Sequence, residues 1–150
     1  MSNLFKADLV EYRSDLKDWK EVVKAGVKML VDKNLATDEL ANAIFESTSQ
    51  YGAYYVLEKG IALLHAAPGP YTLGVGTGTI ILDSPVIFND QADKEAQIIV
   101  TLSSTDAHSH LELLQEFSHY FTIEEFKQKA YQVKSKQEFL ELVKIYQPKE

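Results

Sequence analysis

The stretch GIALLHAAPGP, residues 60–70, decides the architecture expected of this 150-residue chain. It opens with a run of uncharged, mostly apolar residues, which is typical of a buried β-strand. His65 follows that run directly, and a turn of small residues and prolines comes after it. The pattern predicts a strand that delivers an imidazole to the boundary between core and solvent, where a histidine can carry a transferable group.

Two helices are expected before this strand. Apolar residues recur at helical spacing over about residues 18–32, with lysine and glutamate between them. Thr37 and the two acidic residues after it are typical of a helix start, and the inward-facing pattern continues to about residue 49. A tyrosine-rich link leads from there into the strand. We expect its Tyr54 and Tyr55 to pack in the core, as buried aromatic residues usually do.

More strands and then helices are expected after residue 70. Residues 71–82 alternate between glycine on one face and larger residues on the other, which predicts a strand that ends at Asp83-Ser84-Pro85. Residues 97–102 indicate a buried central strand. Helical patterns cover about residues 106–120, 123–131 and 136–146. Thr122 and Ser135 each precede a glutamate at capping-box spacing. Strands between terminal helices predict a sheet covered by helices.

Composition excludes several classes of protein. The chain has no cysteine, which removes disulfide scaffolds, thiolate nucleophiles and cysteine-ligated zinc. A net charge of −7, with Arg13 as the only arginine, argues against nucleic-acid binding and suits either a basic protein partner or simple solubility. The N-terminus lacks the pattern of a signal peptide, and no apolar run reaches membrane-spanning length, so we expect a cytoplasmic protein.

A second histidine is the expected partner of His65. His110 shares an inward-facing stripe with Leu114, Phe117 and Phe121, whereas His108 and His119 project away from it and are expected on the surface. Phosphoryl transfer to histidine needs a neutral ring nitrogen and donors for the phosphoryl oxygens, and a second imidazole can be such a donor.

Hydroxyl groups near the predicted strand ends are further candidates. Ser104 and Thr105 stand between the central strand and the following helix, where hydroxyls and helix N-terminal amides suit a phosphate. The alternative is that Ser104 or Asp106 caps that helix. Tyr51, Tyr54 and Tyr55 could each contribute a hydroxyl to the site or to a partner surface, with core packing the preferred interpretation for Tyr54 and Tyr55.

Three stretches of the chain resemble a known family. QYGAYYVL (residues 50–57), GIALLHA (60–66) and STDAHSHLELL (104–114) are similar to the enzyme IIA component of the sugar phosphotransferase system. The similarity is to the mannitol/fructose superfamily, nearest its ascorbate-type branch, and covers about residues 34–146. It implies an α/β fold with a central mixed β-sheet flanked by helices on both sides, in one domain over residues 1–150.

The resemblance also implies a function. His65 aligns with the histidine that is phosphorylated and His110 with the second active-site histidine, which contacts the phosphoryl group. Members of the family accept a phosphoryl group from the phosphocarrier protein HPr and pass it to an enzyme IIB, which works with the membrane enzyme IIC in sugar uptake. No metal or organic cofactor is implied. Ascorbate or a pentose or pentitol is the sugar that this branch suggests.

Two positions differ from the family pattern, and two other functions stay open. Leu64 and Ala67 stand where members usually have a proline and often an arginine, so a phosphate-binding guanidinium is missing beside His65. A regulatory module that binds a partner without transfer is one alternative. A metal site at His108-Ser109-His110 is another, although no ligand cluster at zinc spacing completes it. The sequence leaves the oligomeric state open, a homodimer included.

Overall fold

The computed structural model describes residues 4–106 and 111–149. Within these residues, five strands form one sheet in the order β1-β4-β5-β3-β2. The strands are β1 (Val10–Arg13), β2 (Val56–Glu58), β3 (Gly60–Leu64), β4 (Gly76–Ile87) and β5 (Glu95–Ser103). The helices are a 3-10 turn η1 (Ala7–Leu9), α1 (Trp19–Val31), α2 (Glu39–Tyr51), α3 (Leu111–Phe121), α4 (Glu124–Ala130) and α5 (Lys136–Tyr146).

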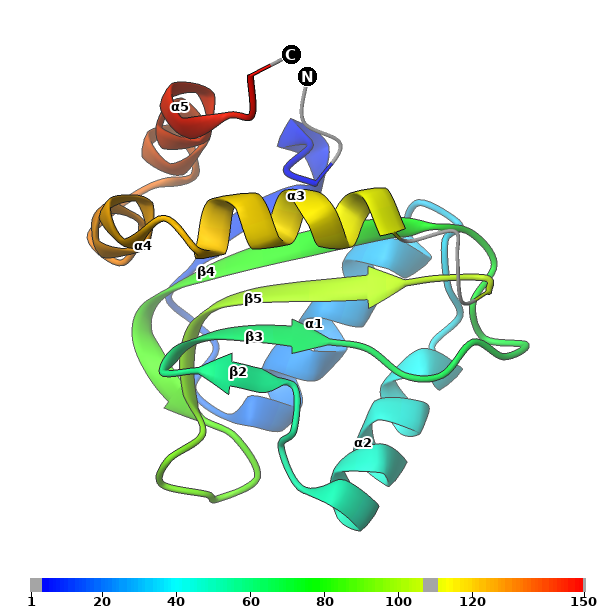
Figure 1. Cartoon of the computed structure of the whole chain (residues 1–150). Helices are drawn as coiled ribbons and strands as arrows, with labels where there is room; N and C mark the ends of the chain where they lie inside the picture. Colours follow the sequence, from blue (N-terminus) through cyan, green and yellow to red (C-terminus); the bar gives the residue numbers. More distant parts are fainter. Residues whose placement is uncertain (1–3, 107–110, 150) are drawn as a thin grey trace.

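The sheet is mixed, and its strand directions bring three chain segments to one end. β5 is central, parallel to β3 and antiparallel to β4, while β1 is parallel to β4 and β2 is antiparallel to β3. The carboxyl ends of β3 and β5 therefore lie beside the start of β4, at the right-hand end of the sheet in Figure 1. The register pairs Leu64 with Thr101 and Gly76 with Ser103.

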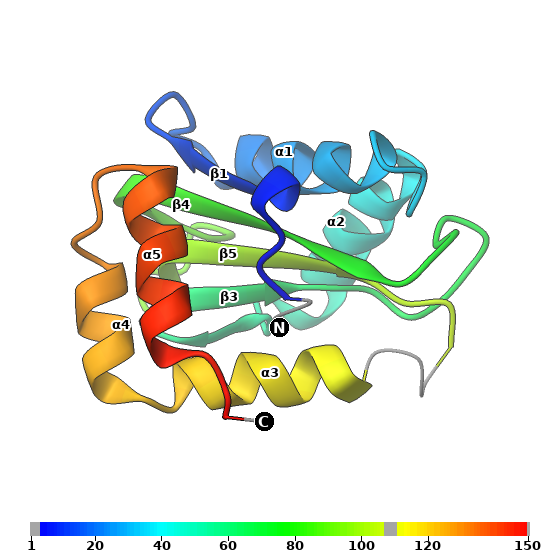
Figure 2. The same cartoon turned by 90° about the horizontal axis from the view of Figure 1, so that it is seen from above.

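Helices cover both faces of the sheet. α1 and α2 lie against one face, and α3, α4 and α5 lie on the other side (Figures 1 and 2). Alternate residues of each strand enter one of two cores, as Ile80 and Ile81 of β4 do. The core under α1 and α2 includes Trp19, and the opposite core contains Phe5 and Phe126, whose rings both pack against that of Tyr120. The expected mixed sheet with helices on both sides is confirmed.

The predicted helices are largely confirmed, and α1 shows why. Asp18 and Glu21 form a capping box at its start, which satisfies amides that have no partner within the helix. The buried residues of α1 follow the helical period, and Gly26 lets the helix approach β5 closely. Ser135 caps α5 as expected, since its hydroxyl accepts from the Glu138 amide at 3.1 Å. The expected cap at Thr122 is wrong, because its hydroxyl donates back to the Ser118 carbonyl.

The strand expected over residues 71–82 begins later and ends later. Residues 71–75 form a loop pinned to the α1–α2 connection, where the Thr37 amide donates to the Tyr71 carbonyl at 2.9 Å. β4 continues through Pro85 to Ile87 because the register shifts between Ile81 and Val86, which accommodates a residue without an amide donor. Among the helices that the structure describes, none has the length and apolar character needed to cross a bilayer.

Candidate functional site

His65 stands at the end of the sheet where β3 stops. It follows Leu64 directly, and its side chain is half-buried while Ala67 and Pro68 beyond it are exposed. The buried strand therefore ends in a titratable side chain at the surface of the core, as the sequence predicts.

The His65 imidazole is held in one tautomer. Its Nδ1 lies 2.7 Å from the backbone carbonyl oxygen of Leu63. A carbonyl oxygen can only accept, so Nδ1 carries the hydrogen and donates it. Nε2 is then the ring nitrogen with the free lone pair. The backbone of β3 thus prepares His65 for nucleophilic attack through Nε2.

Tyr54 contacts both the backbone and the ring of His65. Its hydroxyl donates to the His65 carbonyl at 3.0 Å, and the two ring centroids lie 5.4 Å apart with their planes at 90°. Tyr54 is half-buried, so the expectation that it packs in the core is only partly correct. Tyr55 does pack in the core, because it is fully buried and its hydroxyl lies 2.9 Å from that of Thr48. Burial raises the pKa of Tyr55, and the hydrogen bond to Thr48 opposes part of that rise.

The residues after β5 reach the same end of the sheet. Ser103 is buried, and its hydroxyl lies 2.9 Å from the carbonyl oxygens of both Leu35 and Gly74, so it joins two loops to the sheet. Ser104 is also buried and donates to the Asp106 carbonyl at 2.5 Å, whereas Thr105 is exposed. Because β3 and β5 are parallel, the chain leaves both strands at the same end of the sheet, so Ser104 and Thr105 follow β5 at the end where His65 follows β3. Their role toward a phosphoryl group stays a prediction.

The other candidate residues are placed unequally. Tyr51 is 74% exposed at the end of α2, with its ring centroid 6.4 Å from that of Tyr54. His108 and His110 lie outside the described residues, so the pairing of His65 with His110 stays a prediction. The first described residue after this gap is Leu111, where α3 begins. His119 is half-buried rather than on the surface, because its Nε2 lies 2.7 Å from the Tyr146 carbonyl and joins α3 to α5.

The histidines of the metal-site alternative, His108 and His110, lie outside the described residues, so that alternative stays untested. Over residues 4–106 and 111–149, no group of three or more histidine, aspartate or glutamate side chains converges as ligands would.

Comparison with known proteins identifies the family. The model of the family described as "Phosphoenolpyruvate-dependent sugar phosphotransferase system, EIIA 2" matches residues 3–145. The chain belongs to this family. It is therefore an enzyme IIA component of a sugar phosphotransferase system, and such components are parts of a phosphotransferase.

Individual relatives agree with this assignment of the chain to the enzyme IIA family. The chain is 28% identical over 143 residues to the mannitol-specific cryptic phosphotransferase enzyme IIA component of Escherichia coli K12, covering 95% of this chain and 97% of that one. It is 27% identical over 135 residues to the ascorbate-specific EIIA component of the same strain, covering 89% and 88%.

Solved structures show the same fold. A crystal structure of a PTS IIA protein from Streptococcus mutans matches with a TM-score of 0.83 and 31% identity, over 97% of this chain and 95% of that one. The solution structure of the mannitol-specific cryptic enzyme IIA of Escherichia coli matches with a TM-score of 0.82 and 26% identity, over 94% and 95%.

Proposed function

We propose that this enzyme IIA carries a phosphoryl group on Nε2 of His65. It accepts the group from phosphorylated HPr and passes it to an enzyme IIB, which acts with the membrane enzyme IIC during sugar uptake. The observation that carries the proposal is the 2.7 Å contact between His65 Nδ1 and the Leu63 carbonyl, because it leaves Nε2 as the free nucleophile on a half-buried ring.

The proposed transfer is a displacement at phosphorus. The Nε2 lone pair forms a bond to phosphorus while the bond from phosphorus to the donor atom of phospho-HPr breaks, and the reverse exchange with enzyme IIB releases His65. Phosphorylation at Nε2 places positive charge on the ring. The Leu63 carbonyl stabilises that charge through Nδ1–H, because hydrogen bonds from charged donors are stronger than neutral ones.

The phosphoryl oxygens need donors other than an arginine. Arg13, the last residue of β1, forms salt bridges with Glu11 and Asp15. Two strands, β4 and β5, separate β1 from β3. We therefore assign this task to His110, to the exposed Thr105 hydroxyl, to the Ser104 hydroxyl once it leaves the Asp106 carbonyl, and to neighbouring backbone amides.

The partners and the sugar belong to the same proposal. A solved complex of the Escherichia coli mannitol enzyme IIA with phosphorylated enzyme IIB has this fold, with a TM-score of 0.77 and 17% identity over 93% of this chain, which supports an enzyme IIB as the acceptor. The exposed Tyr51 is a candidate contact for such a partner. The ascorbate-specific relatives support ascorbate or a pentose or pentitol as the sugar, and a cytoplasmic location suits an exchange between carrier proteins.

A labelling experiment tests the proposal. Incubation with phosphorylated HPr is expected to give an adduct that is labile in acid and stable in base. His65→Ala should abolish it. His119→Ala is the matched control, because His119 only joins α3 to α5 and should keep the adduct. An adduct that persists in His65→Ala would overturn the proposal. No adduct with several HPr proteins, together with a partner complex that survives His65→Ala, would favour the regulatory module.

A further inference from the structure

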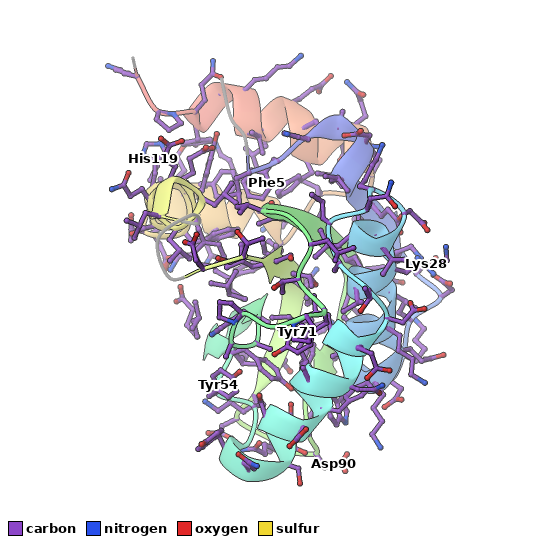
Figure 3. All side chains as sticks on the ribbon, turned by 90° about the vertical axis from the view of Figure 1, so that its right-hand side faces the viewer. Phe5, Lys28, Tyr54, Tyr71, Asp90 and His119 are labelled. Atoms are coloured by element: carbon purple, nitrogen blue, oxygen red, sulfur yellow. The ribbon has the colours of Figure 1, made fainter. Side chains whose placement is uncertain are left out.

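We infer that Tyr54 is a positioning residue for His65, one that sets the orientation in which the imidazole meets a phosphoryl donor. The inference rests on the proposed function, because it assumes that His65 is the nucleophile. Figure 3 views this end of the sheet, with Tyr54 labelled.

Three contacts fix His65, and Tyr54 supplies two of them. The Leu63 carbonyl holds Nδ1 at 2.7 Å, the Tyr54 hydroxyl holds the His65 carbonyl at 3.0 Å, and the Tyr54 ring stands perpendicular to the imidazole. The hydrogen bond from the Tyr54 hydroxyl fixes the peptide group between His65 and Ala66. The edge-to-face contact, with centroids 5.4 Å apart, restricts rotation of the side chain. Together they fix the direction in which Nε2 points.

The turn that presents Tyr54 is itself held on both sides of this residue. The amide of Ala53 donates to Oε1 of Gln91 at 2.8 Å, and the carbonyl of Tyr55 accepts from the amide of Leu63 at 2.9 Å. Leu63 is therefore bonded both to this turn and to the His65 ring. The turn and the strand end form one rigid unit, so Tyr54 is pre-organised against the imidazole.

Such a unit matters because group transfer depends on alignment. The attacking nitrogen must lie in line with the bond that breaks, and small misplacements of a reacting atom cost large factors in rate. A ring held only by its Nδ1 bond could rotate away from the Leu63 carbonyl, and its hydrogen would then exchange between Nδ1 and Nε2. The Tyr54 ring prevents this, so its loss is expected to slow the transfer step more than the encounter with HPr.

Two substitutions separate the hydroxyl from the ring. Tyr54→Phe removes the bond to the His65 carbonyl and keeps the ring, and it should lower the transfer rate about fivefold. Tyr54→Leu removes both, and the loss should reach about 20-fold. The KM for phospho-HPr should change little in Tyr54→Phe. Tyr71→Phe is the matched control: its hydroxyl donates at 2.6 Å to the Ala67 carbonyl in the same loop and does not contact His65.

Nitrogen-15 NMR of the imidazole gives a readout that needs no partner protein. The wild type should show one tautomer with the hydrogen on Nδ1, and Tyr71→Phe should show the same. Tyr54→Leu should show a mixture of tautomers although its far-UV circular dichroism is unchanged. If the wild type takes no phosphoryl group, the proposed function fails, and the imidazole shifts still decide the role of Tyr54. Wild-type tautomer populations in Tyr54→Leu would overturn the inference, as would a wild-type transfer rate in Tyr54→Phe.

Discussion

Substitution of Gly26 by alanine should destabilise the protein at the contact between α1 and β5. An added Cβ would lie 2.2 Å from Oγ1 of Thr101, whereas ordinary contact begins at 3.4 Å, so either the Thr101 side chain must rotate or the helix must move away from the strand. Overpacking of this kind costs about 1–3 kcal/mol, and the better helix propensity of alanine offsets about 1 kcal/mol. Because Thr101 is on a central strand and stiff at χ1, we expect a cost in the upper part of that range, about 2–3 kcal/mol, and so a net loss of about 1–2 kcal/mol.

Urea and thermal unfolding followed by circular dichroism measure this loss. For a chain of this size, the midpoint temperature of thermal unfolding should fall by about 2–8 °C. Gly78→Ala is the control: its Cβ would lie 3.1 Å from the Cβ of Met29, a contact that a shift of a few tenths of an ångström relieves, so the cost should stay below about 1 kcal/mol. Thr101→Ala removes the clashing oxygen, so the double variant should lose less stability than the sum of the two single variants. A Gly26→Ala protein as stable as the wild type would refute the reasoning.

The Gly26→Ala substitution should also affect the proposed phosphoryl-transfer site at His65. Thr101 pairs with Leu64, the residue before His65, so a displacement at this contact reaches the strand end that carries the imidazole. Gly26→Ala should therefore transfer more slowly even at temperatures where it is fully folded, and Gly78→Ala, which also pairs with Thr101 but clashes less, should slow transfer less.

Three further outcomes test local features of the structure. Gly60→Ala should cost about 2–4 kcal/mol in urea unfolding, because Gly60 has a φ of 102° and its Cβ would lie 2.6 Å from the Tyr131 hydroxyl oxygen and 2.7–2.8 Å from the nearest ring carbons. Ser103→Ala should cost about 1–3 kcal/mol by the same assay, since the two loop carbonyls that share its single buried hydroxyl hydrogen lose it. NMR titration should place the pKa of Asp15 at about 2, lowered by its hydrogen bond to Arg13, and Arg13→Gln should return it toward 3.8. The pair therefore stabilises the fold above about pH 3.8, and this small contribution disappears as the pH falls through about 2.

The sequence predicts the elements whose periodicity is strong. α1 and α5 begin and end within one residue of the expected positions, and β3 is the strand expected before His65. The alternating pattern predicts too early a start for β4, because it extends over residues 71–75, whose backbone groups bond to the α1–α2 connection instead. Such a long-range contact leaves no mark on local periodicity, and neither does the register shift that carries β4 past Pro85.

The site was predictable in part. A histidine after an apolar strand gives a clear local pattern, so His65 could be found from the sequence. The role of Tyr54 could not, because Tyr54 and Tyr55 are adjacent residues of one type and only the direction of the turn separates them. Tyr55 enters the core, while Tyr54 turns to the imidazole. The hydrogen bond from Nδ1 to the Leu63 carbonyl depends on side-chain rotation, which a sequence does not record.

Phosphorus and nitrogen NMR of the protein phosphorylated with phospho-HPr tests the central claim most directly. With nitrogen-15 in the histidine rings, the account predicts that phosphorus couples to Nε2 of His65 while Nδ1 keeps its hydrogen bond to Leu63. Coupling to Nδ1, or to a nitrogen of any other histidine, would contradict it.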